Sequence, residues 1–261
     1  MRGIIGTRPP IESGYDELMY WAPLREYYGH SDFVNYGYWE PGIANARAAC
    51  ENLVEKLLAF IPEKDGTILD VACGKGATTQ HLLHHYAPTR VTAIDRADKQ
   101  IKLCQEKLPD CRFMVMDATA LEFEDDSFDN ILSVEAAFHF VPRLAFLREA
   151  RRVLRPGGRL VLSDMLMTRA GEAERRLGSV ENHVPDLDAY RELCREAGFS
   201  EVAVEDVTEP CLHGTFDHLV QFSHSRLLSG EISVEELQTF TRRFFGLVPD
   251  LRYYLLACLR A

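Results

Sequence analysis

From residue 67 onward, the chain alternates short apolar runs with helix-like stretches. The first five runs cover residues 67–72, 90–95, 111–116, 128–134 and 159–165. Because these runs lack the in–out alternation of a strand with one solvated face, they predict a parallel sheet with helices on both sides. Residues 201–207 and 252–259 predict two further strands, and we expect the last to pair antiparallel at the sheet edge. The expected fold is therefore α/β, with a seven-stranded, doubly wound and mostly parallel sheet.

The other segments predict a cover over this sheet. Residues 1–66 are rich in aromatic side chains and predict a helical N-terminal lid, whereas residues 67–261 form the core. Two insertions in the core, near residues 166–187 and 211–245, are expected to cap it, the second of them as helix. We expect a single domain overall.

The charge balance and the cysteines restrict the class of partner. With 29 Lys and Arg against 40 Asp and Glu in 261 residues, the net charge is −11, which disfavours a nucleic-acid partner. The seven cysteines include no C-x-x-C pair, which indicates reduced thiols rather than a disulfide framework. The sequence predicts neither a leader peptide nor membrane insertion. We expect a cytoplasmic monomer or homodimer that acts on a small molecule.

A glycine-rich turn, Cys73-Gly74-Lys75-Gly76, follows the first predicted strand. In an open doubly wound sheet, ligands bind beyond the carboxyl ends of the strands where the strand order reverses, so this turn predicts a binding site. Asp70 lies four residues before Gly74, and a carboxylate there suits a ligand that carries an ammonium group. Thr79 stands where the dinucleotide pattern has its third glycine, which argues against NAD. Asp95, at the end of the second strand, suits the ribose of either class of nucleoside.

Five elements in order resemble the class I S-adenosylmethionine-dependent methyltransferases, in particular their small-molecule branch of natural-product and UbiE-like enzymes. The elements are residues 68–76, Ile94-Asp95, Met116-Asp117-Ala118, residues 127–131 and residues 153–160. The resemblance implies a Rossmann-like fold with S-adenosyl-L-methionine as its cofactor. The family usually has Gly where this chain has Ala72, so we expect the backbone there to approach the methionine moiety less closely.

The resemblance also implies which residues bind the cofactor: Asp70, Ala72, Cys73, Gly74, Gly76, Asp95, Arg96, Gln100, Asp117, Ala118 and Ser133. In the family's pattern, Asp70 and the backbone of the turn hold the methionyl amine and carboxylate, and Asp95 takes the ribose hydroxyls. Arg96 and Gln100 flank the adenine, and Asp117 accepts a hydrogen bond from its amino group. Asp117 is also explained as a turn residue with a solvated carboxylate.

The segment after the fourth strand resembles the Glu-x-x-x-His stretch of sugar and natural-product O-methyltransferases, with Glu135 and His139 in these places. The resemblance implies that His139 is a general base, assisted by Asp164 at the end of the fifth strand. An ordinary imidazole titrates near neutral pH, which suits removal of a proton from a hydroxyl or an ammonium group. The alternative is a packing role for His139 at the start of an apolar helix.

An aromatic motif, Asn35-Tyr36-Gly37-Tyr38-Trp39-Glu40, resembles the N-terminal segment that closes over the cofactor in small-molecule methyltransferases. Ring faces attract a sulfonium and exclude water, so Tyr38 and Trp39 are expected in the lid together with Tyr15. Glu135 and His183 are candidate contacts to the acceptor. The alternative is that the rings only pack helices onto the core.

Three histidines, His81, His84 and His85, share one predicted helix. Their spacing could hold a metal, but no carboxylate or cysteine stands at a matching position beside them. The acidic cluster of a magnesium site is not evident either. We therefore expect these histidines to form an exposed face, and no metal is predicted.

These observations favour an enzyme that transfers a methyl group from S-adenosylmethionine to oxygen or nitrogen of a small secondary-metabolite acceptor, with His139 as base. The alternative within the class is C-methylation of a quinone-, tocopherol- or isoprenoid-like acceptor. An NAD-dependent oxidoreductase would use the same sheet and is disfavoured by the missing third glycine. A cofactor-binding protein without catalysis is a further alternative.

Overall fold

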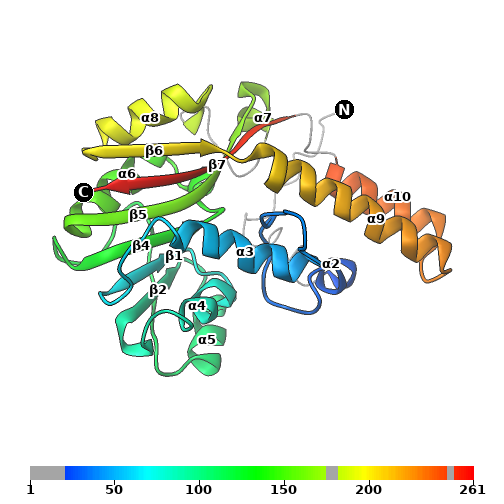
Figure 1. Cartoon of the computed structure of the whole chain (residues 1–261), viewed down its shortest axis with the longest axis horizontal. Helices are drawn as coiled ribbons and strands as arrows, with labels where there is room; N and C mark the ends of the chain where they lie inside the picture. The colour runs from blue at the N-terminus through cyan, green and yellow to red at the C-terminus, as the bar shows by residue number, and fades with distance from the viewer. Residues whose placement is uncertain (1–20, 175–181, 246–249) are drawn as a thin grey trace, which may run out of the picture.

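The computed structural model describes residues 21–174, 182–245 and 250–261, which form a seven-stranded sheet with helices around it (Figure 1). The strands are β1 (Ile68–Val71), β2 (Val91–Asp95), β3 (Arg112–Val115), β4 (Phe128–Val134), β5 (Leu154–Met167), β6 (Glu201–Asp206) and β7 (Leu251–Arg260). Their order is β3-β2-β1-β4-β5-β7-β6. Strands β1 to β5 pair in parallel, whereas β7 pairs antiparallel with β5 and with β6. The predicted doubly wound sheet is confirmed, and its order reverses between β1 and β4.

The predicted place of the last strand is wrong, because β7 lies inside the sheet and β6 forms the edge. Most of β7 is buried, as expected for an apolar strand with a neighbour on each side. Strand β6 instead exposes Glu201, Glu205 and Asp206. Charged side chains of this kind keep an edge strand from pairing with other chains, so β6 suits the edge better than β7 does.

Helices cover both faces of the sheet (Figure 1). The helices and helical turns are α2 (Ala22–Tyr27), α3 (Ala46–Leu58), α4 (Ala77–Leu82), η1 (Pro88–Arg90), α5 (Asp98–Lys107), η2 (Ala137–His139), α6 (Arg143–Val153), α7 (Arg169–Glu174), α8 (Leu187–Glu196), the π-helical turn η4 (Glu209–His213), α9 (Gly214–Leu228) and α10 (Val234–Phe245). Helices α3, α4 and α5 bury side chains in one apolar cluster, and α6 and α8 bury theirs in a second cluster. Within the described residues, none of the helices has both the length and the apolar character that a membrane span needs.

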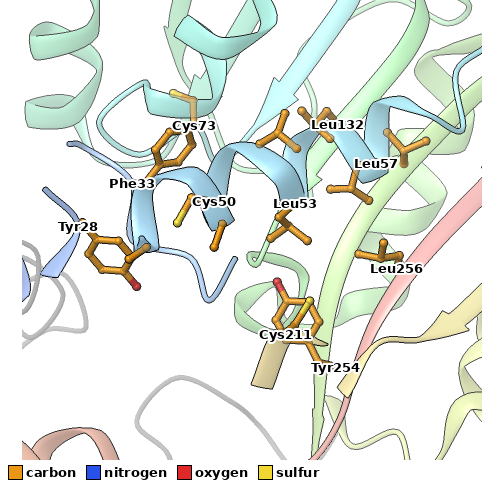
Figure 2. Packing of buried hydrophobic residues seen from close by; sticks show 14 of the residues in the cluster. Tyr28, Phe33, Cys50, Leu53, Leu57, Cys73, Leu132, Cys211, Tyr254 and Leu256 are labelled. Carbon is orange, nitrogen blue, oxygen red and sulfur yellow. The ribbon is translucent and has the colours of Figure 1, made fainter. Parts of the chain in front are cut away.

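Helix α3 holds the N-terminal part of the chain on the sheet. Asn45 caps this helix by accepting a hydrogen bond from the Ala48 amide at 3.0 Å. Leu53 and Leu57 are fully buried and lie in one cluster with Leu256 of β7 (Figure 2). Burying a leucine side chain contributes about 2 kcal/mol, so these contacts fix α3 firmly against the sheet.

The covering segments match their predictions in part. Within residues 1–66, α2 and α3 are helical, but much of the chain between them is irregular and includes Gly37 in the left-handed region. The second insertion forms two helices, α9 and α10, because the chain turns at Gly230, whose φ is +76°. These two helices contact each other and extend away from the sheet (Figure 1). In the first insertion, β5 continues to Met167 before α7 begins.

The close approach of the aromatic motif to α3 requires a glycine at position 37. A Cβ on Gly37 would lie 2.6 Å from Ala49 Cβ, whereas a Cβ on Gly42, also at positive φ, would meet nothing within 4 Å. We expect Gly37→Ala to lower the free energy of unfolding by about 2 kcal/mol more than Gly42→Ala does, because only the first adds overpacking to backbone strain. Urea denaturation of the two variants measures this difference. Equal losses would show that the contact with α3 relaxes without cost.

Candidate functional site

The carboxylate of Asp70 is buried at the carboxyl end of β1, 1% exposed. Its Oδ2 accepts a hydrogen bond from Thr79 Oγ1 of α4 at 2.6 Å. Burial raises the pKa of Asp70 to about 7, and the nearby charge of Asp95 adds to this rise while the Thr79 bond opposes it. A buried carboxylate of this kind is stabilised by a cationic group, so the site favours a ligand with an ammonium.

The glycine-rich turn has three residues in the left-handed region: Ala72 (φ +63°), Gly74 (φ +53°) and Gly76 (φ +82°). A Cβ on Gly74 would meet nothing within 4 Å, so this glycine leaves the backbone open to a ligand. A Cβ on Gly76 would lie 2.9 Å from the sulfur of Cys104, so this glycine lets the turn pack on α5. Ala72 takes a backbone conformation that glycine adopts without strain, which gives a physical reason for the family's preference at this position.

Asp95 joins the turn to the end of β2. Its Oδ2 accepts a hydrogen bond from the Gly74 amide at 3.0 Å, and its Oδ1 accepts one from the Ala97 amide at 2.9 Å. The Cys73 amide donates to the Ile94 carbonyl at 3.0 Å. A carboxylate has about four lone-pair positions, so Asp95 keeps acceptor capacity beyond these two amides. The structure thus brings the predicted turn and the predicted ribose acceptor into direct contact.

Asp117 follows β3 and forms a local turn. Its Oδ1 accepts hydrogen bonds from the amide and the hydroxyl of Thr119, at 2.8 Å and 2.7 Å. Burial acts to raise the pKa of Asp117, but these bonds and the nearby Arg96 charge outweigh it and lower the pKa. The Met116 amide donates to the Asp95 carbonyl at 3.0 Å, which places this strand end beside that of β2. Asp117 therefore has a structural role as a turn residue, and its role toward adenine stays a prediction.

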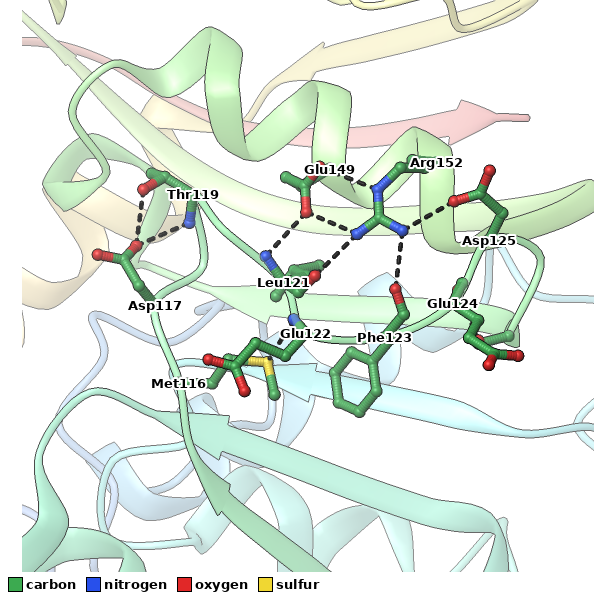
Figure 3. Close-up of polar contacts among 11 residues, drawn as sticks. Met116, Asp117, Thr119, Leu121, Glu122, Phe123, Glu124, Asp125, Glu149 and Arg152 are labelled. Carbon is green, nitrogen blue, oxygen red and sulfur yellow. Dashed lines mark hydrogen bonds and ion pairs between the residues drawn. The ribbon is translucent and has the colours of Figure 1, made fainter.

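Arg152 of α6 fastens the loop that begins at Asp117 (Figure 3). Its guanidinium donates to the carbonyls of Leu121 and Phe123, at 2.8 Å and 2.7 Å, and forms an ion pair with Glu149. Glu149 in turn accepts from the Leu121 amide at 2.8 Å. Sequence reasoning did not find this anchor, because a charged residue on an amphipathic helix reads as a solvated one. Contacts with α6 thus hold the loop after Asp117 in place.

The other predicted cofactor contacts lie around the same strand ends. Ser133 is buried, and its hydroxyl donates to the Val71 carbonyl at 3.3 Å, which ties β4 to β1. Gln100 is buried in the first turn of α5, Arg96 is exposed directly after β2, and Ala118 is buried after β3. Their contacts to a ligand stay predictions.

Glu135 links three distant parts of the chain at the end of β4. Its Oε1 accepts hydrogen bonds from the Tyr36 amide at 2.6 Å and from the Tyr254 hydroxyl at 2.5 Å. Its own amide donates to the Ser163 hydroxyl at 3.0 Å, and its φ of +49° is unusual for a residue with a side chain. Burial raises the pKa of Glu135 to about 8, although both hydrogen bonds to its side chain oppose the rise. Glu135 thus attaches the aromatic motif to the sheet.

Tyr38 and Trp39 pack against helices in this structure. The Trp39 ring stacks on His218 of α9 with centroids 3.6 Å apart, and its Nε1 donates to Thr215 Oγ1 at 2.8 Å. Lys56 of α3 lies 4.9 Å from the ring centre of Tyr38. These contacts are those of packing residues, and closure over a cofactor stays a prediction. Tyr15 lies outside the described residues.

His139 ends the turn η2, and its ring lies 3.9 Å from that of Phe138. Asp164 is fully buried, and its Oδ2 lies 2.8 Å from Nε of Arg143. The sequence did not predict Arg143 as a partner, because the two residues lie on different elements of the fold. The Asp164 carboxylate is therefore paired with Arg143, and its assistance to His139 stays a prediction.

A polar network connects Arg143 to the turn that carries His139. The Arg143 amide donates to Asn182 Oδ1 at 2.6 Å, and its Nη1 donates to the Asn182 carbonyl at 2.7 Å. Asn182 Nδ2 donates to the Phe138 carbonyl at 3.2 Å. Next along the chain, Nδ1 of His183 is buried without a hydrogen-bond partner among the described residues. A buried polar atom of this kind suits contact with a ligand.

The expectation of an exposed histidine face is wrong for His81, which is 8% exposed. Its Nε2 lies 2.6 Å from Glu55 Oε1, and Nε2 of His85 lies 2.8 Å from the same oxygen. The expectation of one helix for all three histidines is also wrong, because α4 ends at Leu82 and His84 and His85 follow it. The carboxylate that contacts His81 and His85 is supplied by α3. His84 is exposed, as expected.

The chain is similar to known methyltransferases. A family model described as a methyltransferase domain matches residues 69–162. Erythromycin 3''-O-methyltransferase of Saccharopolyspora erythraea is 32% identical over 71% of this chain and 68% of its own length. The 27-O-demethylrifamycin SV methyltransferase of Amycolatopsis mediterranei is 30% identical over 96% of both chains. The chain belongs to the methyltransferase family, and the resemblance to class I small-molecule methyltransferases is confirmed.

Solved structures share the fold at lower sequence identity. The crystal structure of the cyclase SpnF matches with a TM-score of 0.70 and 21% identity, over 97% of both chains. The geranyl diphosphate C-methyltransferase of Streptomyces coelicolor A3(2), in complex with S-adenosyl-L-homocysteine, has a TM-score of 0.64 at 16% identity. It covers 97% of this chain and 100% of that one. These likenesses concern the fold alone.

The raised pKa of Glu135 predicts a pH-dependent stability. The folded pKa of about 8 lies above the ordinary value of 4.5, so folding favours the protonated form. The resulting stability is complete below the ordinary pKa and is lost as pH rises through about 8. Glu135→Gln keeps the acceptor oxygen without the charge. As the pH rises from about 5 to about 8.5, we therefore expect the free energy of unfolding of the variant to increase by roughly 2–4 kcal/mol relative to that of the wild type.

Urea denaturation at both pH values measures this change. Asp70 also titrates in this range and is present in both proteins, so the difference between them isolates Glu135. A constant difference between the two proteins at both pH values would contradict the assignment.

Proposed function

We propose that the protein transfers a methyl group from S-adenosyl-L-methionine to an oxygen of a small natural-product acceptor, with nitrogen as the second possibility. The observation that carries the proposal is the buried Asp70 carboxylate beside the open backbone at Gly74. The names of the two relatives support the acceptor class, because both describe methyltransferases of natural products and both specify an oxygen.

The residues at the strand ends fit the cofactor. Asp70 would bind the methionyl ammonium, and this group would be a positively charged partner for the buried carboxylate. The open backbone at Gly74 would admit the methionyl carboxylate, and Asp95 would use its remaining acceptor capacity for the ribose hydroxyls. Asp117 and Ala118 would face the adenine edge, flanked by Arg96 and Gln100, while Ala72, Cys73, Gly76 and Ser133 shape the turn and the strand ends. When bound, the cofactor supplies an activated methyl carbon.

His139 is the proposed general base. Methyl transfer to a hydroxyl needs alignment of the acceptor and removal of one proton, and an imidazole can accept that proton. Asp164 would act at a distance, because its ion pair with Arg143 leads through Asn182 to the carbonyl of Phe138. We therefore assign Asp164 as a positioning residue for the turn that carries His139.

The covering segments are proposed to select the acceptor. Residues 1–66 would form the lid over the core of residues 67–261, held in place through Glu135 and through the packing of Tyr38 and Trp39. The insertions near residues 166–187 and 211–245 would cap the site. The buried Nδ1 of His183 would contact the acceptor.

C-methylation is the alternative to transfer to oxygen or nitrogen, because a base at His139 serves proton removal from carbon as well as from oxygen. The atom that receives the methyl group distinguishes the two. Analysis of the methylated product of a polyhydroxylated acceptor, compared with an isoprenoid acceptor, would decide between them.

Cofactor binding tests the role of Asp70. We expect titration calorimetry to show binding of S-adenosylmethionine and not of NAD. Asp70→Asn should weaken the affinity at least tenfold, because the amide cannot pair with the ammonium. In the wild type, affinity should fall as pH decreases below about 7, the pKa of Asp70, whereas the variant should show a flatter dependence.

Asp188→Asn is a matched control, since this carboxylate lies on α8 with 91% of its side chain exposed. Binding of NAD without binding of S-adenosylmethionine would refute the proposed function.

The role of His139 is tested by His139→Gln. We expect cofactor affinity to stay the same and kcat to fall by roughly 10²–10⁴, the usual contribution of a general base. His84→Gln, at an exposed position, should change neither. Calorimetry for the cofactor and product formation with a macrolide acceptor give the two measurements. An unchanged kcat in His139→Gln would leave alignment alone as the source of catalysis.

A further inference from the structure

Glu55, His81 and His85 bring three metal-ligand atoms together, away from the strand ends. Glu55 comes from α3, His81 from α4 and His85 from the residues that follow α4. Both histidines direct Nε2 at the same carboxylate oxygen, at 2.6 Å and 2.8 Å, and all three ligand atoms lie within 4.8 Å of one another. The four-residue spacing of the histidines places both on one side of the chain.

We propose that this cluster binds a divalent transition-metal ion, with zinc as the preferred ion. Two imidazole nitrogens and one carboxylate oxygen are a donor set that zinc accepts in proteins, with water as a fourth ligand. The donors converge from two elements that are far apart in the sequence, Glu55 and His81 being separated by 26 residues. That convergence is absent from an isolated pair such as Glu209 and His213, which lie one helical turn apart on an exposed surface.

The geometry lies close to that of a bound ion. Ligands at about 2.0–2.1 Å from a tetrahedral zinc are roughly 3.3 Å apart, slightly more than the 2.6 Å and 2.8 Å that separate Glu55 Oε1 from the two histidine nitrogens. Glu55 has a rotatable side chain that is 44% exposed, so it can move outward by this small amount. His85 is 27% exposed, so the cluster is open to solvent on this side.

The histidine tautomers decide how the ion would enter. Both Nε2 atoms lie within hydrogen-bond distance of Glu55 Oε1, so in the metal-free cluster a proton can lie between each nitrogen and this oxygen. A metal ion would replace these protons, and each imidazole would then carry its proton on Nδ1 and present Nε2 to the ion.

A bound ion would connect two functional parts of the fold. Helix α3 holds the N-terminal segment, and α4 begins directly after the glycine-rich turn and carries Thr79, the hydrogen-bond partner of Asp70. The ion would thus clamp α3 to the helix that supports the proposed cofactor site. This consequence rests on the proposed function, whereas metal binding itself does not.

Zinc titration of the reduced, full chain tests the proposal. We expect one zinc ion per chain by calorimetry and a rise in melting temperature with zinc, because the ion binds only the folded cluster. Glu55→Gln and His85→Ala should each weaken the affinity at least tenfold and abolish the rise. His85 is preferred over the buried His81, and the melting temperature without metal confirms that each variant folds.

His213→Ala is the matched control, because it removes a histidine that contacts a carboxylate outside the cluster. It should leave zinc affinity unchanged. Cobalt absorption without a thiolate charge-transfer band would show that the seven cysteines are not the ligands. Equal affinity in wild type, Glu55→Gln and His85→Ala, or no binding to the wild type, would overturn the proposal. Neither result depends on S-adenosylmethionine, so failure here is distinct from failure of the proposed function.

Discussion

The buried carboxylate of Asp70 is the constraint on which the site depends. A carboxylate without a charge partner is costly to bury, and Thr79 offsets only part of that cost. The strand order reverses next to this residue, between β1 and β4, so the loops after both strands diverge and leave its surroundings to a ligand. The glycine-rich turn and Asp95 are arranged around the same point. The fold thus concentrates unsatisfied negative charge where a cationic ligand can be bound.

Glu135 has the same property but a different function. It is a partly buried acid with a raised pKa, and its Oε1 accepts hydrogen bonds from Tyr36 and Tyr254. It therefore joins chain segments, and its contact with an acceptor stays a prediction. The two acids show that a raised pKa alone does not identify a binding residue. The groups that contact each carboxylate have to be compared as well.

Local pattern predicted the parallel strands and the glycine-rich turn, because both depend on residues next to each other in the chain. Contacts between distant elements were not predictable in this way. Tyr36 and Glu135 are 99 residues apart, and Asp164 lies 21 residues from Arg143, on another element. The histidines were interpreted as an exposed face because the carboxylate that contacts His81 and His85, Glu55, belongs to a different helix. The edge position predicted for β7 was wrong, since an apolar strand can pair at an edge or between two strands and the local pattern does not distinguish the two.

The interior position of β7 has a consequence for the order in which the protein is assembled. Strand β6 pairs only with β7 within the described sheet, so it has no place to attach until residues 251–260 have been synthesised. Strands β1 to β5 can pair as they leave the ribosome, but the β6 segment must wait, together with the intervening α9 and α10. Completion of this sheet therefore depends on long-range contacts that form late, which slows folding and leaves the edge of β5 that pairs with β7 unpaired for longer.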